Sequence, residues 1–249
     1  MKTFNSITTF SGHAERMQQW FDTCLGQYLL EQEQQYFDHA VANIFGYNAL
    51  QIGCPQFDFL RLNRIPFKFN VGMSSGVSLQ ALPTFLPIES GSMDLTVLPH
   101  VLEFSPQPHQ ILREAYRVLI PEGHIVISGF NPISLWGTPR YFKSLKNEFP
   151  WCGDFVGLAR LKDWLKLLGF EIVGGRLGCY VPPFRKEKWL KRFCFMEAAG
   201  DRWWPISGGV YFLQAVKQVH GMRIIQPRWK KKFSSKKRII PATQKLEDK

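Results

Sequence analysis

The chain has 249 residues, 45% of them hydrophobic, and a formal net charge of +11 at pH 7. This length and apolar content are sufficient for one compact domain of enzyme size. No apolar run approaches the roughly 18 residues of a membrane span, and the opening MKTFNSITTF lacks the apolar core of a secretory signal. Five scattered cysteines without a CxxC pair argue against a zinc site and predict a cytoplasmic protein with reduced thiols.

The N-terminal part, residues 1–45, is predicted to form a helical cap. Apolar residues recur at helical spacing from Met17 to Leu29 and continue in the same phase from Tyr36 to Phe45. Gly26 is expected to loosen or break this helix. The stripe is typical of packing against a sheet, and a lid over a substrate pocket is the alternative interpretation.

An α/β domain is predicted over residues 46–222. Short runs of strand-forming residues occur at 48–53, 67–71, 77–81, 93–98, 124–128, 171–174 and 208–219. Ser105 is a predicted N-cap, with Pro106 as the first residue of a helix that ends before 121–123. A second helix is predicted from Leu158 until Gly169 ends it.

The strand, helix and strand between residues 93 and 128 predict a parallel, right-handed crossover. In open α/β sheets the ligand crevice lies outside the carboxyl ends of such strands. Pro99, His100 and Asn131 follow these strands and are therefore expected near a ligand site.

The stretch from Leu86 to Pro132, with the motif ISGFNPIS at 127–134, resembles the C-terminal half of a class I S-adenosylmethionine-dependent methyltransferase domain. The resemblance extends over about residues 46–219 and is closest to small-molecule enzymes and poorly characterised bacterial members. It implies a Rossmann-like, seven-stranded, mostly parallel sheet with helices on both faces and a closing antiparallel pair. It also implies S-adenosylmethionine as cofactor and direct methyl transfer to a small-molecule or other acceptor.

The cofactor loop departs from the family pattern, in which an acidic residue precedes G-x-G-x-G. Gly53 occupies the first glycine position, but Gln51 replaces the acid, and Pro55 and Phe57 replace the later glycines. Leu82 stands where the family often has Asp. Loss of one carboxylate contact weakens binding by roughly 10- to 150-fold. Two functions therefore stay open, a divergent methyltransferase and a noncatalytic methyltransferase-like binding protein.

Candidate site residues follow from the strand ends and from the resemblance. The cofactor-binding set is Gly53, Cys54, Leu86, Pro99 and His100. His100 is also the candidate catalytic base, with a structural role as the alternative.

Two further residues are candidates for substrate binding. Asn131 either bonds substrate or stabilises its turn. Trp136 belongs to an aromatic segment, residues 133–157, that is either a substrate wall or part of the core. Glu103 and His109 are expected on the surface, and no metal-ligand spacing is present.

The positive charge is concentrated at the C-terminus. Residues 223–249 hold 10 Lys and Arg against 2 Asp and Glu, and so contribute +8 of the net charge. The cluster WKKKFSSKKR within this tail predicts disorder. It is either a solvated tail with weak polyanion affinity or a contact, at residues 228–238, for nucleic acid or an anionic surface.

Overall fold

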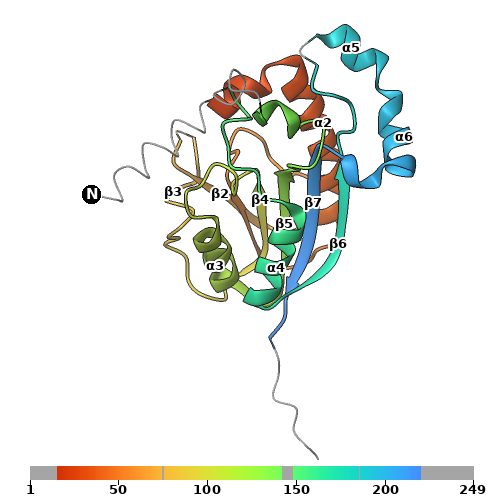
Figure 1. The fold of residues 1–249 in the computed structure, drawn as a ribbon. Helices are drawn as coiled ribbons and strands as arrows, with labels where there is room; N and C mark the ends of the chain where they lie inside the picture. Colours follow the sequence, from red (N-terminus) through yellow and green to blue (C-terminus); the bar gives the residue numbers. More distant parts are fainter. Residues whose placement is uncertain (1–15, 75, 142–147, 185, 220–249) are drawn as a thin grey trace, which may run out of the picture. The chain divides into compact units, whose positions relative to one another are not determined.

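A computed structural model describes residues 16–219 except 75, 142–147 and 185. Seven strands form one sheet in the order β3-β2-β1-β4-β5-β7-β6 (Figure 1). The strands are β1 (Asn48–Ile52), β2 (Phe67–Gly72), β3 (Leu79–Gln80), β4 (Met93–Pro99), β5 (Leu119–Phe130), β6 (Phe170–Gly178) and β7 (Val210–Lys217). The pairs among β1 to β5 are parallel, whereas β7 runs antiparallel to both β5 and β6. The predicted Rossmann-like sheet with a closing antiparallel pair is confirmed.

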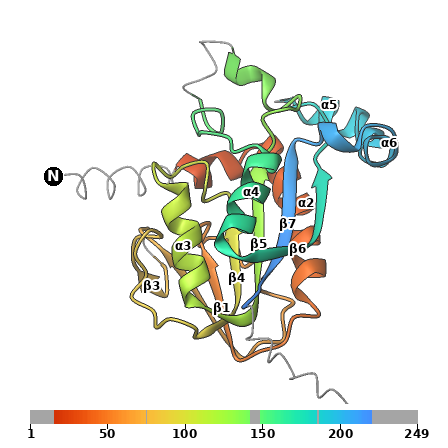
Figure 2. The same cartoon turned by 60° about the horizontal axis from the view of Figure 1, so that its bottom comes forward.

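Helices cover both faces of the sheet, as predicted. On one face lie α3 (Pro108–Val118) and α4 (Leu158–Leu168), and α2 (Cys24–Val41) lies on the other (Figure 2). Alternate residues of one strand separate the two cores: in β1, Leu50 packs with the α3 and α4 residues, whereas Ala49 packs with α2. Other described helical segments include α5 (Glu187–Arg192), α6 (Phe195–Trp203), η1 (Thr138–Tyr141) and η2 (Pro205–Ser207).

The connections from β1 to β4 contain no helix among their described residues. The face that crossover helices usually cover is instead packed by α2 and by apolar residues of the loop after β1, notably Phe59, Leu60 and Ile65. The carboxyl ends of β1, β2 and β4 are therefore followed by loops rather than by crossover helices, except that α3 follows the loop after β4. This places the N-terminal segment directly against the expected ligand site.

The break in the N-terminal helical region differs from the prediction. Residues 16–21 are helical, and the new helix α2 begins after Thr23, whose hydroxyl accepts a hydrogen bond from the Gly26 N–H at 3.1 Å. Gly26 lies inside α2, so the expectation that it breaks the helix is wrong. A Cβ at Gly26 would lie 2.3 Å from the Trp20 carbonyl oxygen, which explains the need for glycine where the two helical segments meet.

The start of α3 and the end of α4 can be compared with the helix ends that the capping residues predicted. α3 begins at Pro108 rather than at Pro106, and the Ser105 hydroxyl accepts from the Gln107 N–H at 3.0 Å in the preceding turn. The predicted Ser105 cap is therefore wrong by two residues. α4 ends as predicted at Gly169, which adopts the left-handed conformation with φ of 94°.

Candidate functional site

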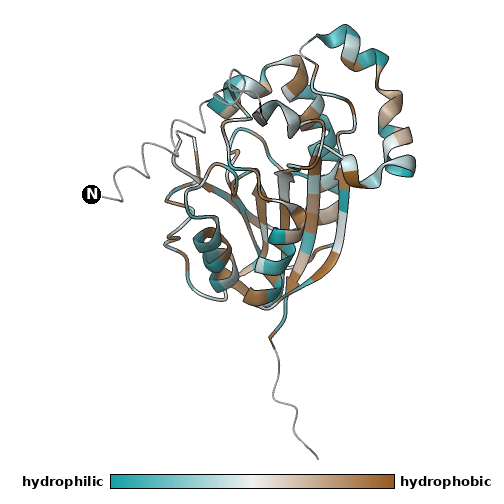
Figure 3. Cartoon of the chain, viewed as in Figure 1, coloured by the Kyte–Doolittle hydropathy of each residue, from teal (hydrophilic) through white to brown (hydrophobic). Residues whose placement is uncertain are grey.

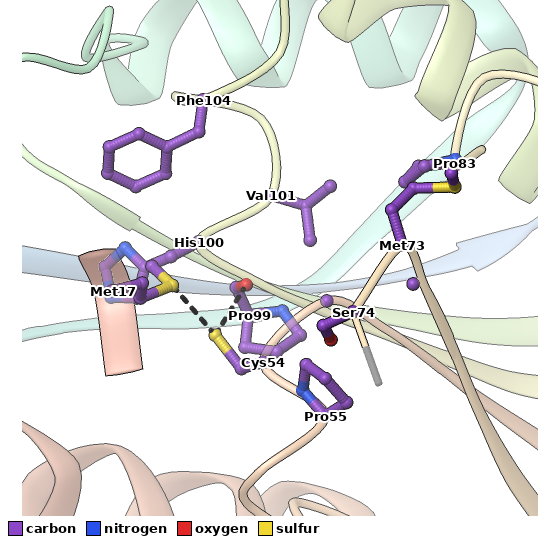
Figure 4. Close-up of a pocket in the computed structure, with 12 residues that line it drawn as sticks. Met17, Cys54, Pro55, Met73, Ser74, Pro83, Pro99, His100, Val101 and Phe104 are labelled. Atoms are coloured by element: carbon purple, nitrogen blue, oxygen red, sulfur yellow. Dashed lines mark hydrogen bonds between the residues drawn. The ribbon is translucent and has the colours of Figure 1, made fainter. Parts of the chain in front are cut away.

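A groove opens where β1, β2 and β4 end, at the carboxyl edge of the parallel sheet (Figure 4). It holds about 510 Å³ of empty space, which includes space open to solvent. Because the strand order reverses between β1 and β4, the groove lies at the topological switch point of the sheet. Its described lining residues are Met17, Gly53, Cys54, Pro55, Gly72, Met73, Ser74, Pro83, Pro99, His100, Val101 and Phe104.

The loop after β1 turns sharply against the groove. Gly53 has φ of 88°, and a Cβ there would lie 2.3 Å from Cγ2 of Val101. Cys54 also has a positive φ, 44°, which is uncommon for a residue with a side chain. Its Sγ lies 3.2 Å from Sδ of Met17 and 3.5 Å from the carbonyl oxygen of Pro99. Burial raises the pKa of the Cys54 thiol, so this cysteine is a neutral wall residue.

The side-chain amide of Gln51 holds the loop after β1 in place through hydrogen bonds. Its Nε2 donates to the carbonyl oxygens of Gly53, Cys54 and Phe57 at 3.1, 3.0 and 2.7 Å. Its Oε1 accepts from the Phe59 N–H at 3.0 Å. A carboxylate could accept the last bond but could not donate the others. The glutamine that departs from the family pattern therefore braces the loop in a way that an acid could not.

The loop after β2 carries a polar group that the sequence did not indicate. Ser74 follows Gly72 and Met73 in the groove wall, and its Oγ is buried without a hydrogen-bond partner among the described residues. A buried hydroxyl without a partner is costly, so such an atom marks a place where a ligand or water would bond. Because serine is common in loops, the sequence gives no reason to choose Ser74, and only the structure identifies its hydroxyl as a candidate ligand contact.

His100, at the end of β4, lies between two carboxylates. Its Nε2 is 2.8 Å from Oε1 of Glu33 in α2, and its Nδ1 is 3.2 Å from Oε1 of Glu103. Burial lowers the pKa of His100, but the negative charges of Glu33 and Glu103 and the hydrogen bond to Glu103 outweigh it and raise this pKa to about 10. The imidazole is therefore a cation at neutral pH, and both ring nitrogens face carboxylates. Its φ of 50° is the second positive value at a non-glycine residue of the groove, after that of Cys54.

Glu103 is buried, with 2% of its surface exposed, so the expectation that it lies on the surface is wrong. Its Oε1 also accepts a hydrogen bond from the Phe130 N–H at 2.6 Å. A Cβ at Gly129 would lie 2.4 Å from the Tyr211 hydroxyl and 3.0 Å from Oε1 of Glu103, so glycine makes room for both groups. Burial, reinforced by the negative charge of Glu103, raises the pKa of Tyr211. His109, in contrast, is exposed as predicted.

Comparisons with known proteins agree with this geometry. The family model described as a methyltransferase domain matches residues 69–127. The uncharacterized protein YafS of Escherichia coli K12 is 33% identical over 157 residues, which are 62% of this chain and 65% of YafS. The chain thus spans slightly less than two thirds of that relative.

Solved structures show the same architecture. An S-adenosylmethionine-dependent methyltransferase of Thermotoga maritima, a possible histamine N-methyltransferase, superimposes with a TM-score of 0.58 at 17% identity and covers 85% of this chain and 99% of its own. This chain has the class I S-adenosylmethionine-dependent methyltransferase fold. The [4+2]-cyclase SpnF shares that fold, with a TM-score of 0.53 at 18% identity over 75% of this chain and 80% of SpnF. The fold alone therefore does not determine the reaction.

The methyltransferase-fold groove has residues that fit S-adenosylmethionine. Its walls are mostly apolar, from Met17, Val101 and Phe104 among others, and suit a nucleoside base. The unpartnered Ser74 hydroxyl lies at the end of β2, where the family binds ribose hydroxyls. The turn at Gly53 brings main chain to the groove without an intervening side chain. The described lining residues include no carboxylate, so main-chain and apolar contacts predominate.

The structure brings together some of the predicted site residues and separates others. Gly53, Cys54, Pro99 and His100 line the groove. Leu86 does not: its side chain is buried in the core beside α3, and its N–H donates to Oε2 of Glu114 at 3.0 Å.

The two candidate substrate-binding residues are buried away from the groove walls. The Nδ2 of Asn131 donates to the carbonyl oxygens of Ile206 and Gly208, each at 3.0 Å, and so joins the loop after β5 to η2. Trp136 is 1% exposed, packs among aromatic rings, and donates from Nε1 to the Val181 carbonyl at 2.8 Å. These contacts favour turn stabilisation over substrate binding for Asn131, and core packing over a substrate wall for Trp136.

The remaining predictions concern the basic tail, metal binding and membrane spans. The predicted contact at residues 228–238 lies outside the described residues. Within the described part of the chain, no cluster of His, Cys, Asp and Glu has the arrangement of a metal site. No described helix is both long and apolar enough to cross a bilayer.

Proposed function

We propose that the protein is an S-adenosylmethionine-dependent methyltransferase that binds its cofactor in the groove formed at the ends of β1, β2 and β4. The observation that carries this proposal is the groove itself, which lies at the switch point of a methyltransferase-fold sheet. The domain match over residues 69–127 supports it. No observation in the comparisons favours the noncatalytic alternative.

When bound, S-adenosylmethionine supplies an electrophilic methyl group to the lone pair of an acceptor oxygen, nitrogen or carbon. The chain contributes binding, orientation and exclusion of water. Ser74 would bond a ribose hydroxyl, and Met17, Val101 and Phe104 would enclose the apolar part of the cofactor.

His100 has the geometry of a positioning residue. Both its nitrogens face carboxylates, and its pKa of about 10 keeps it protonated, so it has no free lone pair to accept a proton from a substrate. Its pair with Glu33 joins α2 to the end of β4, and His100 itself forms part of the groove wall. We therefore infer that it holds the helical cap in place over the site.

The acceptor would approach along an aromatic wall. Phe104 lines the groove and stacks on Phe149, with ring centroids 4.8 Å apart. Beyond Phe149, Trp20 and Trp151 line a second hollow with Thr23, Leu25 and Glu148. We propose this hollow, next to the cofactor groove, as the acceptor side of the site.

A cytoplasmic location stays a prediction from the cysteine content.

Calorimetric titration with S-adenosylmethionine and S-adenosylhomocysteine tests the cofactor site. Met73→Trp places a large ring in the groove at a position that is only half-buried, so the domain should fold. We expect saturable binding in the native protein and its loss in Met73→Trp. The matched control is Phe85→Trp, at a site 74% exposed and outside the groove lining, which should bind normally. Absence of binding by folded native protein, or unchanged binding in Met73→Trp, would contradict the proposed site.

A further inference from the structure

Exposed aromatic and aliphatic side chains concentrate between β6 and β7. Over residues 201–207, at the end of α6 and in η2, every residue is exposed. Trp203, Trp204 and Ile206 expose 71%, 57% and 75% of their surface, and Phe195 and Trp189 expose 63% and 44%. In Figure 1 the helices α5 and α6 project from the body of the domain, and Figure 3 shows hydrophobic and hydrophilic residues along both helices.

A second segment joins the same surface. The buried Asn131 amide donates to the carbonyl oxygens of Ile206 and, at 3.4 Å, of Ile133, so these two backbones lie close together. Ile133 is 76% exposed, and Leu135 is 46% exposed. We call the group of Ile133, Leu135, Trp203, Trp204 and Ile206 the apolar edge. Large apolar side chains exposed singly are ordinary, but a group of them rimmed by polar residues marks an interaction surface.

The charge around the apolar edge is positive. Residues 186–206 contain five basic side chains, Lys186, Lys188, Lys191, Arg192 and Arg202, against three acidic ones, Glu187, Glu197 and Asp201. Glu197 points back into the domain, where it accepts from the N–H groups of Tyr180 and Val181 at 2.8 and 3.2 Å. All five basic residues are exposed, so the outward-facing charge of the segment is more positive than its composition indicates.

We propose that the apolar edge and the basic residues of α5 and α6 dock onto the surface of an anionic lipid bilayer. Tryptophan is enriched at the boundary between water and hydrocarbon because its ring is apolar and its N–H is polar. Exposed isoleucine and leucine gain from entering hydrocarbon, whereas a nucleic-acid backbone offers them no comparable contact. Basic residues beside them add attraction to anionic headgroups. This combination favours lipid over nucleic acid.

The apolar edge also lies at the end of the sheet that carries the groove. Phe130, at the end of β5, pairs with Val210, at the start of β7, and Pro99 of the groove pairs with Ser128. The edge therefore flanks the carboxyl ends of the strands. Docking does not require methyl transfer, so its test is independent of the proposed function.

Co-sedimentation of the full chain with vesicles tests the docking. We compare vesicles of phosphatidylcholine alone with vesicles that also contain phosphatidylglycerol. The main variant is Trp203→Ser/Trp204→Ser/Ile206→Ser. Its matched control is Phe45→Ser/Tyr47→Ser, which removes side chains that are 69% and 78% exposed just before β1, at the other end of the strands.

The native chain and the control should bind the anionic vesicles, and the triple variant should bind at least about tenfold more weakly, since three apolar side chains no longer leave water. Lys188→Glu/Arg192→Glu should also weaken binding. Deletion of residues 223–249 tests whether the basic tail is responsible for binding. If the apolar edge binds the vesicles, the shortened chain should still bind them. The proposal is overturned if the triple variant binds like the native chain, if only the tail deletion abolishes binding, or if native protein prefers neither vesicle. S-adenosylmethionine titration of each variant reports separately on the groove.

Discussion

The Glu33–His100–Glu103 cluster makes the sharpest prediction about the stability of the fold. His100→Asn removes the cation but keeps a residue type that tolerates the observed φ of 50°. Two buried carboxylates, Glu33 and Glu103, then remain near the same site without a counter-charge. Breaking a buried pair in this way costs about 3–5 kcal/mol, which corresponds to a decrease in the melting temperature of roughly 6–20 °C for a domain of this size.

Glu33→Gln provides the matched comparison. It leaves His100 paired with Glu103, whose Oε1 still accepts the Phe130 N–H. One charge of each sign then remains, so the loss should be smaller, about 1–2 kcal/mol. The double variant Glu33→Gln/His100→Asn leaves a single buried carboxylate, so it should be destabilised by less than the sum of the two single changes.

The dependence of stability on pH provides a second measurement with a defined sign. The pKa of His100 rises from 6.5 to about 10 on folding. Its contribution to stability is therefore complete below pH 6.5 and is lost as pH increases toward 10. Urea unfolding across this range should show the loss in native protein and its absence in His100→Asn. His109→Asn, at an exposed position, is the control. A His100→Asn variant within about 1 kcal/mol of the native protein at neutral pH would refute the ion-pair assignment.

Three further changes test local features. Gln51→Glu restores the acid of the family pattern but directs a carboxylate at three carbonyl oxygens, so it should cost about 3 kcal/mol and weaken S-adenosylmethionine binding, measured by urea unfolding and calorimetry. Gly26→Ala places a methyl group 2.3 Å from the Trp20 carbonyl oxygen and should cost about 1–3 kcal/mol in thermal unfolding. Gly169→Ala, at φ of 94°, should cost about 1–2 kcal/mol. A stability equal to that of native protein in any of the three would contradict the contact concerned.

The sheet could be predicted from the sequence because its strands are short apolar runs bounded by turn residues. β1, β2 and β4 start where the pattern indicated. β5 begins at Leu119, earlier than the predicted residue 124, and the turn predicted at Pro121–Gly123 is a break in its register, with φ of 62° at Glu122. Leu119 pairs with Met93 and His124 pairs with Leu95, so residues 120–123 have no partner in the β4 register and the local turn signal is retained within the strand.

The site was less predictable because its decisive contacts join distant parts of the chain. The end of β4 indicated that His100 would lie near a ligand, but no spacing connects it with Glu33, 67 positions earlier and on another element. The departure at Gln51 suggested a degraded loop, although the amide forms four hydrogen bonds there. Leu86 fits the family motif by position, yet the packing of α3 buries it in the core.

The backbone conformations of two groove residues indicate that the shape of the groove has a role beyond packing. Four described non-glycine residues have positive φ, and two of them, Cys54 and His100, follow the neighbouring strands β1 and β4 at the groove. Each such residue costs free energy that the surrounding structure must offset. The Gln51 amide constrains the first and the carboxylates of Glu33 and Glu103 constrain the second. Burying apolar strands requires neither feature, so both support the proposal that the groove binds a ligand.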